Sequence, residues 1–494
     1  GVVWIEVADR GGELGATRAG VTGEAPSDVL WHYNLSARHL DKLCERVDTF
    51  SVSGDGERLV VRHRDDTIVV PSSHKVDDDD PAYIRVDLTR LRRTVNPRAE
   101  WRQMFDENGR LMASHYWRED MNGVDWDSVL NRYRPLVDLC HVVDDLHDIL
   151  WETVAELNTS HSYVSASGAA GDSDMRAGLL GADVSSGNDG AKVVRVIPGE
   201  SSDPRAWSPL RAAGVAVTEG DVIVAVDGRK VGADGNLGEL LEGSAGRVVE
   251  LTVRRGENER QVAVVPMADE APLRYHDWVA SRRRYVEEHS GGRLGYLHVP
   301  DMVSDGWAEL HRQIGEATRH EGVIADVRFN HGGHTSQLVV ERLARRVVGW
   351  DYSRWYATAD TYPQNAVRGP IVMVTNQWAG SDGDIVAAAT QAMGYAKVIG
   401  ERSWGGVVGI DGRFDLVDGT SVTQPRYAGW YGSYGWGVEN HGVDPDIVVT
   451  VSPEDWEADC DVQLDAAIAE CLRQLDDKPA ATAPELPGPA FDRC

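Results

Sequence analysis

The feature that most constrains the fold of this chain is a regular alternation of strand-like and helical patterns in its second half. The apolar, β-rich runs are RLGYLHV, GVIADVRF, PIVMVTN and AKVIGE, and helical patterns lie between them. This alternation is typical of an α/β layer whose functional groups lie in loops at the strand ends. The chain has 494 residues. That is about three times a typical domain of ~150 residues, so we expect further domains ahead of this layer.

Composition narrows the class of protein. Hydrophobic residues make up 42% of the chain and charged residues 26%, as in ordinary globular domains. The net charge of −29 repels phosphate backbones and anionic lipids, so we expect no nucleic-acid or membrane partner. No apolar run reaches the ~18–20 residues that span a bilayer, and no signal peptide opens the chain. The cysteines are scattered without the spacing of a zinc site or a disulfide framework, which fits a cytoplasmic protein.

The first 80 residues predict part of a β-rich domain. Apolar and polar residues alternate from Val52 to Val70 around a Gly-Asp-Gly turn, as in a two-strand hairpin. A lone hairpin is marginally stable in water, so we expect a larger sheet, such as the end of a truncated β-propeller. The chain enters abruptly at Gly1, and we expect that an N-terminal portion is missing. The acidic run Asp77–Asp80 predicts a solvated linker.

Residues 81–170 predict a helical subdomain. A helix begins at Pro97, directly after an asparagine that can serve as its N-cap, and carries apolar residues at helical spacing. Another helix begins at Asp144 or Asp145 and ends at Asn158. His161 therefore follows a helix end, where side chains are more exposed than in a core.

Residues 171–268 change character again. They form short β-rich runs separated by Gly, Pro and Asp turns. The order of these runs resembles a PDZ domain, with Gly178-Leu179-Leu180-Gly181 in the place of its carboxylate-binding loop. Such domains bind an extended peptide at a sheet edge, but an internal scaffold that binds nothing is an equal alternative.

Ser381 is the candidate nucleophile. It lies in the segment NQWAGSDGDI, between the apolar strand Ile371–Thr375 and the helix-forming run Ala387–Met393. A serine at a glycine-flanked strand-to-helix turn projects its hydroxyl from a tight bend, and N–H groups at the helix start point toward developing negative charge. Gly-Ser-Asp-Gly alone is a weak signal, because a serine before a helix is more often a plain N-cap. The hydroxyl also needs a base, and His161 is the candidate, although a loop histidine is more often structural.

Two further glycine-rich segments carry candidate groups. The segment RFNHGGH follows the strand GVIADV, and its glycine amides can contribute to an oxyanion hole. His331 and His334 would also suit a metal, but no third ligand is obvious, so we expect no metal site. The segment WGVENHGVDPDI contains Glu439, which could orient and polarise a catalytic histidine, although an acid in such a loop is ordinarily just solvated.

Together these pieces resemble the C-terminal half of the tricorn protease family, over roughly residues 50–475. The motifs that carry the resemblance are, in order, EWRQMF, GVDW, RYRPL, ELNTSHSYV, DVRFNHGGH, NQWAGSDGD and GVENHGVDPDI. The resemblance implies a multidomain α+β chain. Its expected parts are the end of a β-propeller and a linker (1–80), a helical C1 subdomain (81–170), a PDZ-like domain (171–268), an α/β catalytic C2 subdomain of the tail-protease or crotonase-like type (269–475) and a disordered tail (476–494).

The resemblance also implies a serine peptidase that hydrolyses oligopeptides through an acyl-enzyme and uses no cofactor. Ser381 would be the nucleophile and His161 the general base and acid. Ser160 and Glu439 would complete a tetrad by tuning the imidazole. The peptide substrates would be products of the proteasome or another large protease.

Further expectations rest on the same resemblance. The amides of Gly333 and Asp382 would form the oxyanion hole, and Asp351 would help to select a basic side chain before the scissile bond. The chain would belong to a homo-oligomer, a hexamer in the family, with upstream β-propellers that gate the entry and exit of peptides.

Two alternatives stay open at this point. C-terminal processing proteases share the PDZ and α/β plan but use a Ser–Lys dyad, and their lysine falls where this chain has Gly406. Lys397 is a weak substitute because it lies in a strand-like run. The other alternative is a PDZ-centred adaptor whose peptidase-like domain has lost its activity.

Overall fold

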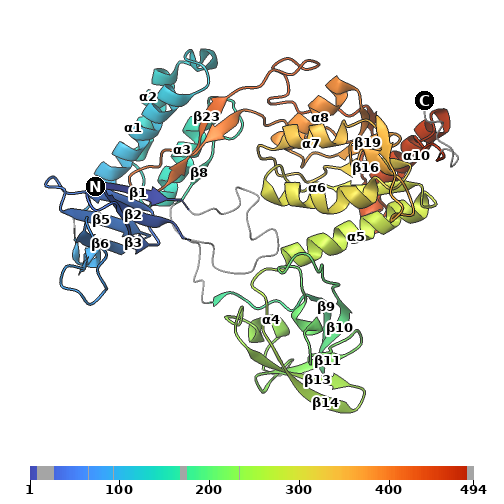
Figure 1. Ribbon diagram of the computed structural model, residues 1–494, viewed down its shortest axis with the longest axis horizontal. Helices are drawn as coiled ribbons and strands as arrows, with labels where there is room; N and C mark the ends of the chain where they lie inside the picture. Colours follow the sequence, from blue (N-terminus) through green and yellow to red (C-terminus); the bar gives the residue numbers. More distant parts are fainter. Residues whose placement is uncertain (8–26, 65, 93, 167–174, 233, 487–494) are drawn as a thin grey trace. The chain divides into compact units, whose positions relative to one another are not determined.

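The structure is a computed structural model that describes residues 1–7, 27–64, 66–92, 94–166, 175–232 and 234–486. The chain divides into two compact units, Gly1–Pro97 and Arg98–Cys494. The architecture is multidomain α+β, as the sequence predicts, and Figure 1 shows its elements. Among the described residues, no helix combines the length and the apolar character that crossing a bilayer needs.

The first unit consists of two antiparallel sheets. One sheet has the order β1 (Val2–Glu6), β2 (Val29–Asn34), β3 (His39–Glu45), and the other has the order β4 (Thr49–Val52), β5 (Arg58–His63), β6 (Asp66–Pro71), β7 (Ile84–Arg85). Alternate residues of the strands point inward. Five of them form one buried cluster together with Val47 of the loop between β3 and β4: Leu30, Leu43, Leu59, Val61 and Val70.

Two expectations for this unit need correction. The run Val52–Val70 holds more than a two-strand hairpin, because the Gly-Asp-Gly turn joins β4 to β5 and a second turn joins β5 to β6. With β7 these strands form a four-stranded sheet, which is the larger sheet that the sequence predicts. The run Asp77–Asp80 is not a linker between domains. It is a largely exposed turn ahead of β7, which pairs with β6 in the same sheet, and the unit continues to Pro97.

The helical subdomain contains α1 (Pro97–His115), α2 (Trp126–Val137) and α3 (Val143–Ala155). The helix expected from Pro97 is therefore present. Asp145 accepts hydrogen bonds from the N–H groups of His141 and Val142, at 2.7 and 3.2 Å, which fixes the start of α3. The helix α2 was not foreseen by periodicity, although two of the family motifs lie on it or beside it.

The PDZ-like domain is a six-stranded antiparallel sheet. Its main path has the order β14 (Asn258–Val264), β13 (Val249–Arg255), β11 (Val222–Val226), β10 (Gly190–Val196), β9 (Ala182–Gly187), and β12 (Arg229–Lys230) pairs with β11. The short helix α4 (Leu237–Leu240) packs into the same core as the sheet.

The α/β domain has a five-stranded parallel sheet. Its order is β15 (Leu294–His298), β16 (Gly322–Asp326), β19 (Ile371–Thr375), β20 (Ala396–Gly400), β24 (Ile447–Val448). The first four strands contain the apolar runs that the sequence predicts. Helices α6 (Ser304–Ala317), α7 (Ser336–Leu343) and α8 (Asp382–Met393) cover one face, and α5 (Ala271–His289) and α10 (Val462–Asp477) cover the other (Figure 1). Because all strands are parallel, their carboxyl ends meet at one edge, where the loops carry the candidate residues.

One excursion from this domain reaches the helical subdomain. Residues 409–427, here called the arm, contain β21 (Gly409–Asp411), β22 (Ser421–Val422) and β23 (Gln424–Tyr427). The strand β22 pairs with β8 (Val164–Ser165), which directly follows the His161 loop. Leu416 and Val422 of the arm are buried in one cluster with residues of α1 and α3. The arm therefore ties the α/β domain to the segment that carries His161.

The remaining elements are short. In the described ranges they are β17 (Gly349–Asp351), β18 (Asp360–Tyr362), α9 (Pro453–Glu457) and the 3₁₀ turns Leu88–Arg90, Met121–Gly123 and Pro209–Arg211. The expected disordered tail is only partly described. The helix α10 continues to Asp477, and residues 478–486 form no helix or strand but hydrogen-bond to the α/β domain, since Ala481 N–H donates to Arg368 O at 2.8 Å and Tyr352 Oη donates to Pro484 O. The expectation for residues 487–494 lies outside the described part of the chain.

Candidate active site

Ser381 lies at the turn from β19 into α8, where the sequence predicts it. Its φ of 56° and ψ of −121° are rare for a residue with a side chain, so the surrounding structure must hold this strained bend. Ser381 occupies the N-cap position of α8, yet its side chain makes no capping hydrogen bond. The hydroxyl is thus not spent on the helix, which argues against the plain N-cap interpretation. Instead, Ser381 lines a cavity of about 210 Å³.

His161 lines the same cavity. It lies in the loop after α3 with a φ of 58°, and the hydroxyl of Thr423 in the arm donates to its carbonyl oxygen at 2.5 Å. The imidazole meets the rings of Tyr163 and Trp404 edge to face, with centroids 5.8 and 5.5 Å away. Among the hydrogen bonds of the described residues, none joins Ser381 Oγ to this imidazole. The two groups share a cavity, and such contacts often tighten only when substrate is bound.

A chain of hydrogen bonds runs from the imidazole to Glu439. Ser160 Oγ lies 3.0 Å from His161 Nδ1 and 3.0 Å from Glu439 Oε2. Glu439 also accepts the N–H of Ser160 at 2.7 Å and the N–H groups of Val407 and Val408 at 2.8 and 3.0 Å. The carboxylate of the Gly-rich loop is therefore bound on several sides and is not merely solvated.

These contacts determine which imidazole nitrogen carries the proton. As a carboxylate, Glu439 can only accept, so the Ser160 hydroxyl donates to it and must itself accept from His161 Nδ1–H. In the neutral ring this leaves a lone pair on Nε2, the nitrogen that a general base uses. Burial lowers the pKa of His161 below its ordinary value of 6.5, and the charge of Glu439 opposes this only in part. The neutral, basic form is therefore favoured near neutral pH.

The Gly-Gly loop lies directly against the nucleophile. A Cβ atom added to Gly332 would lie 2.4 Å from Ser381 Cβ, and one added to Gly333 would lie 2.2 Å from the carbonyl oxygen of Met302. Both glycines also have positive φ, at 75° and 146°. Only glycine fits at these two positions, because the close approach leaves no room for a side chain. The backbone of the loop is thus brought beside Ser381.

Asp382 begins α8 next to Ser381, and its buried carboxylate accepts the N–H of Ser336 at 2.9 Å. Its side chain is thereby turned toward the start of α7, and its pKa is raised by burial. Its own amide is one of the first N–H groups of the helix, which lack intrahelical acceptors and suit a developing oxyanion.

Sequence reasoning missed Asp384 and Asn330, both of which are fully buried. Asp384 accepts hydrogen bonds from Ser403 Oγ and from the N–H groups of Gly405 and Gly406, at 2.8 and 3.3 Å for the amides. Burial raises the pKa of Asp384 to about 6. Asn330 accepts the N–H of Gly332 at 2.9 Å through its side chain. Both are polar residues inside otherwise apolar or glycine-rich turns, and this pattern in the sequence could have indicated buried hydrogen-bonding roles.

Two residues named from the sequence lie away from the Ser381 cavity. Asp351 is exposed on β17, in register with Asp360 on β18, and does not line the cavity. Lys397 is exposed on β20 and pairs with Asp446 at 3.0 Å. The lysine of a Ser–Lys dyad has no counterpart in this cavity. Among the described residues, no group of three or more potential ligands could hold a metal ion, and His331 lines the cavity without such a group.

The loop Gly178–Gly181 of the PDZ-like domain is already engaged. Its N–H groups at Gly178, Leu179 and Gly181 donate to Leu241 O, Met267 O and Glu270 Oε2, at 2.8, 2.8 and 3.1 Å. A loop that binds a terminal carboxylate needs free amides. The occupied amides favour the alternative in which this loop serves as a scaffold.

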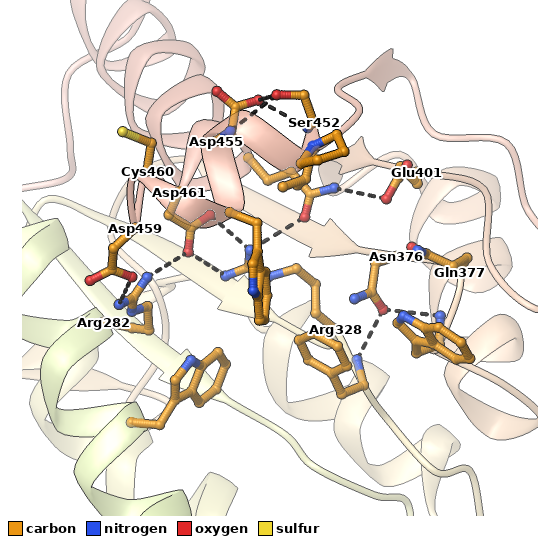
Figure 2. A pocket seen from close by; sticks show the side chains of 17 residues that line it. Arg282, Arg328, Asn376, Gln377, Glu401, Ser452, Asp455, Asp459, Cys460 and Asp461 are labelled. Atoms are coloured by element: carbon orange, nitrogen blue, oxygen red, sulfur yellow. Dashed lines mark hydrogen bonds and ion pairs between the residues drawn. The ribbon is translucent and has the colours of Figure 1, made fainter. Parts of the chain in front are cut away.

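A larger cavity of about 700 Å³ adjoins the site (Figure 2). It lies beside the loops that follow β16, β19 and β20, and Gln377 and Trp378 line it as well as the Ser381 cavity. The two cavities therefore share a wall formed by Gln377 and Trp378, and Trp378 lies three residues before Ser381 in the chain.

Comparisons with known proteins agree with this architecture. The family model of peptidase family S41 matches residues 293–449, that of the tricorn protease PDZ domain matches residues 178–269, and that of the tricorn protease C1 domain matches residues 97–155. These ranges coincide with the α/β, PDZ-like and helical domains described above.

Individual relatives match nearly the whole chain. Tricorn protease homolog 1 of Streptomyces coelicolor is 55% identical over 492 residues, which cover 99% of this chain and 46% of that protein. The tricorn protease of Thermoplasma acidophilum is 35% identical over 454 residues, or 92% of this chain and 42% of that protein. A crystal structure of the tricorn protease superposes with a TM-score of 0.87 at 33% identity, covering 96% of this chain and 46% of that one.

The chain spans less than half the length of these relatives. Along the chain, the C1, PDZ and S41 family models match in that order. The structural match to the tricorn protease covers 96% of the chain and so includes the helical, PDZ-like and α/β domains. The chain therefore belongs to the tricorn protease family of serine-type peptidases.

Proposed function

We propose that this chain hydrolyses oligopeptides through an acyl-enzyme formed on Ser381, with His161 as general base and acid and with Ser160 and Glu439 positioning the imidazole. The observation that carries the proposal is the shared cavity. A strained serine with an uncommitted hydroxyl lines it from one domain, and a histidine lines it from another. The contact that aligns this histidine joins Ser160 and Glu439, which are 279 positions apart in the chain.

The geometry supports a specific sequence of proton transfers. Ser381 Oγ attacks the peptide carbonyl carbon while its proton passes to His161 Nε2, and the imidazolium gains support from the Ser160 and Glu439 chain. The C–N bond then breaks as His161 returns the proton to the leaving amine. Water next attacks the ester carbonyl, gives its proton to His161, and the proton returns to Ser381 Oγ as the peptide acid departs.

The oxyanion of both tetrahedral intermediates needs hydrogen-bond donors. We assign this role to the N–H groups of Gly333 and Asp382, because the Gly-Gly loop abuts Ser381 and Asp382 opens α8 directly after it. One such donor is worth roughly 2.7–4 kcal/mol of the barrier. No metal ion or cofactor enters this scheme.

Several finer points belong to the proposal and rest on family membership. The substrates are oligopeptides released by the proteasome or another large protease, in the cytoplasm. The working form is a homo-hexamer, and Asp351 helps to select a basic residue before the scissile bond.

Covalent labelling tests the proposal most directly. A serine-directed phosphonate should form an adduct that peptide mapping locates on Ser381, and the Ser381→Ala variant should lose peptide hydrolysis by several orders of magnitude while it stays folded. Thr390→Ser, a hydroxyl change elsewhere on α8, serves as the matched control and should still be labelled. An adduct on another residue, or unchanged turnover in Ser381→Ala, would refute the serine mechanism.

A further inference from the structure

The larger cavity beside the active site has no role in the chemistry described above. Its volume of about 700 Å³ lies within the range of roughly 300–1,000 Å³ that is usual for ligand sites. Since Gln377 and Trp378 line both cavities, a peptide held at Ser381 can place a neighbouring side chain in the larger one.

Aromatic rings form much of its wall. Trp278, Phe329, Trp378 and Trp456 all line the cavity. Trp378 and Trp456 are 64% and 78% exposed, and Phe329 is 40% exposed. Exposed rings gathered next to a reactive serine are unusual on a surface that binds nothing. Their faces suit flat or cationic groups, because the ring quadrupole attracts positive charge.

The cations in the wall are already neutralised. Arg328 is buried and forms ion pairs with Asp326 at 2.7 Å and with Asp461 at 2.8 Å. Arg282 pairs with Asp461 at 3.2 Å and with Asp459 at 3.7 Å. These two guanidinium groups are therefore committed to carboxylates of this chain and do not attract an anionic ligand.

Within the described residues, two carboxylates of the wall, Glu401 and Asp455, form no ion pair. Asp455 is engaged by Ser452, whose N–H and hydroxyl donate to it at 3.0 and 2.8 Å, so Glu401 is the less committed of the two. It is half-buried, and within the described residues it forms no ion pair; its side chain accepts only one long hydrogen bond, from Gln463 Nε2 at 3.5 Å. Glu401 N–H donates to Thr375 O at 3.2 Å, which places the residue beside the end of β19, where Asn376 and Gln377 begin. Figure 2 shows Glu401 on the same side of the cavity as Asn376 and Gln377, away from Arg282 and Asp459.

From these observations we propose that the larger cavity is a substrate subsite that takes the cationic side chain of an arginine or lysine near the scissile bond. Glu401 pairs with the charge, and the tryptophan rings pack on the aliphatic stem and the cationic head. The inference rests on the proposed peptidase function, because it needs a peptide at Ser381. It concerns a different position from Asp351, which lies on the β17–β18 hairpin and lines neither cavity.

Binding to the Ser381→Ala chain tests this inference without turnover. Labelled peptides carry one arginine at successive positions, and each has a twin with citrulline, which has the same shape but no charge. We expect the arginine peptide to bind about tenfold more tightly at one or two adjacent positions, with a preference that weakens as salt is added. Adding Glu401→Gln should remove this preference and leave citrulline binding unchanged.

The control is Glu454→Gln, which removes an exposed carboxylate on α9. Glu454 lies between Pro453 and Asp455, which line the cavity, but does not line the cavity itself. This variant should keep the preference for arginine. The inference is overturned if the arginine and citrulline peptides bind equally well. It is also overturned if Glu401→Gln and Glu454→Gln lose the preference for arginine to the same extent, because the preference then comes from the overall charge of the chain. Because phosphonate labelling of the wild-type chain reports on Ser381 separately, failure of this inference and failure of the peptidase function give different results.

Discussion

At the scale of single residues, the chemistry of the site depends on the hydrogen-bond partners of each polar group. Ser160 transmits the charge of Glu439 to the imidazole, since its one hydroxyl proton goes to the carboxylate and its lone pair faces Nδ1–H. Ser381, by contrast, has no cap bond to α8. The residue types at these positions are visible in the sequence, but the direction of each hydrogen bond is not.

The pH dependence of activity should report the environment of His161. Because burial lowers the pKa of His161, its neutral form persists below the ordinary value of 6.5. The acid limb of kcat/KM should therefore lie below pH 6.5, and activity should fall as pH drops through it and protonates Nε2. The measurement is kcat/KM against pH on a neutral peptide.

Asp384 offers a control for this profile, since its pKa is raised to about 6 by burial. The same profile should be recorded for Asp384→Asn. A limb that stays in place in this variant belongs to His161. A limb above pH 6.5, or one that disappears in Asp384→Asn, contradicts the assignment.

At the scale of elements, the arm connects two folding regions that the sequence presents as separate. Its strands are two to four residues long and carry no period, so pattern reasoning could not find them. By contrast, α1 and the β19-to-α8 turn follow from local spacing and were predicted. The position of His161 depends on the arm through Thr423, which accepts from Tyr163 N at 2.7 Å and donates to His161 O.

A substitution that removes buried side-chain volume from the arm should therefore impair catalysis as well as stability. Val422 is fully buried between the arm and the helical subdomain, and Val422→Ala should cost roughly 2 kcal/mol in the free energy of unfolding. It should also lower kcat, because the His161 loop loses support. The matched change Val264→Ala, in the core of the PDZ-like domain, should cost a similar amount with kcat preserved. If both variants keep full kcat, the arm does not position His161.

At the scale of the whole molecule, the chain matches less than half the length of its relatives, and the proposed hexamer can be tested through Asp351. Asp351 lies outside the Ser381 cavity of its own chain. If it selects basic residues as proposed, a neighbouring copy in the proposed hexamer is one route by which its carboxylate reaches the cavity. Light scattering should then give the mass of six chains under the conditions in which selectivity is measured.

The variant Asp351→Asn tests the selectivity. It should lower kcat/KM for cleavage after Arg or Lys more than for cleavage after Phe, because it removes the carboxylate that attracts the cation. Asp360→Asn, which alters the register partner on β18, is the matched control and should leave the ratio unchanged. Equal losses for the basic and aromatic substrates in Asp351→Asn would show that the residue is not the determinant.

The sequence alone indicated four of the five strands of the parallel sheet and the motifs that hold the serine, the histidine and the glycines, because each of these is a short local pattern. The order of the domains followed from the family motifs taken together. The contacts between residues that are far apart in the chain could be seen only in the tertiary structure. Only the structure shows that the acidic run at 77–80 is a turn, that Asp351 and Lys397 lie outside the Ser381 cavity, and that the amides of the PDZ-like loop are occupied. It also shows that Asn330 lines the Ser381 cavity and that Glu401 lines the larger one. Contacts between residues hundreds of positions apart arise from packing among β8, β22 and the helical subdomain, and no local pattern encodes that packing.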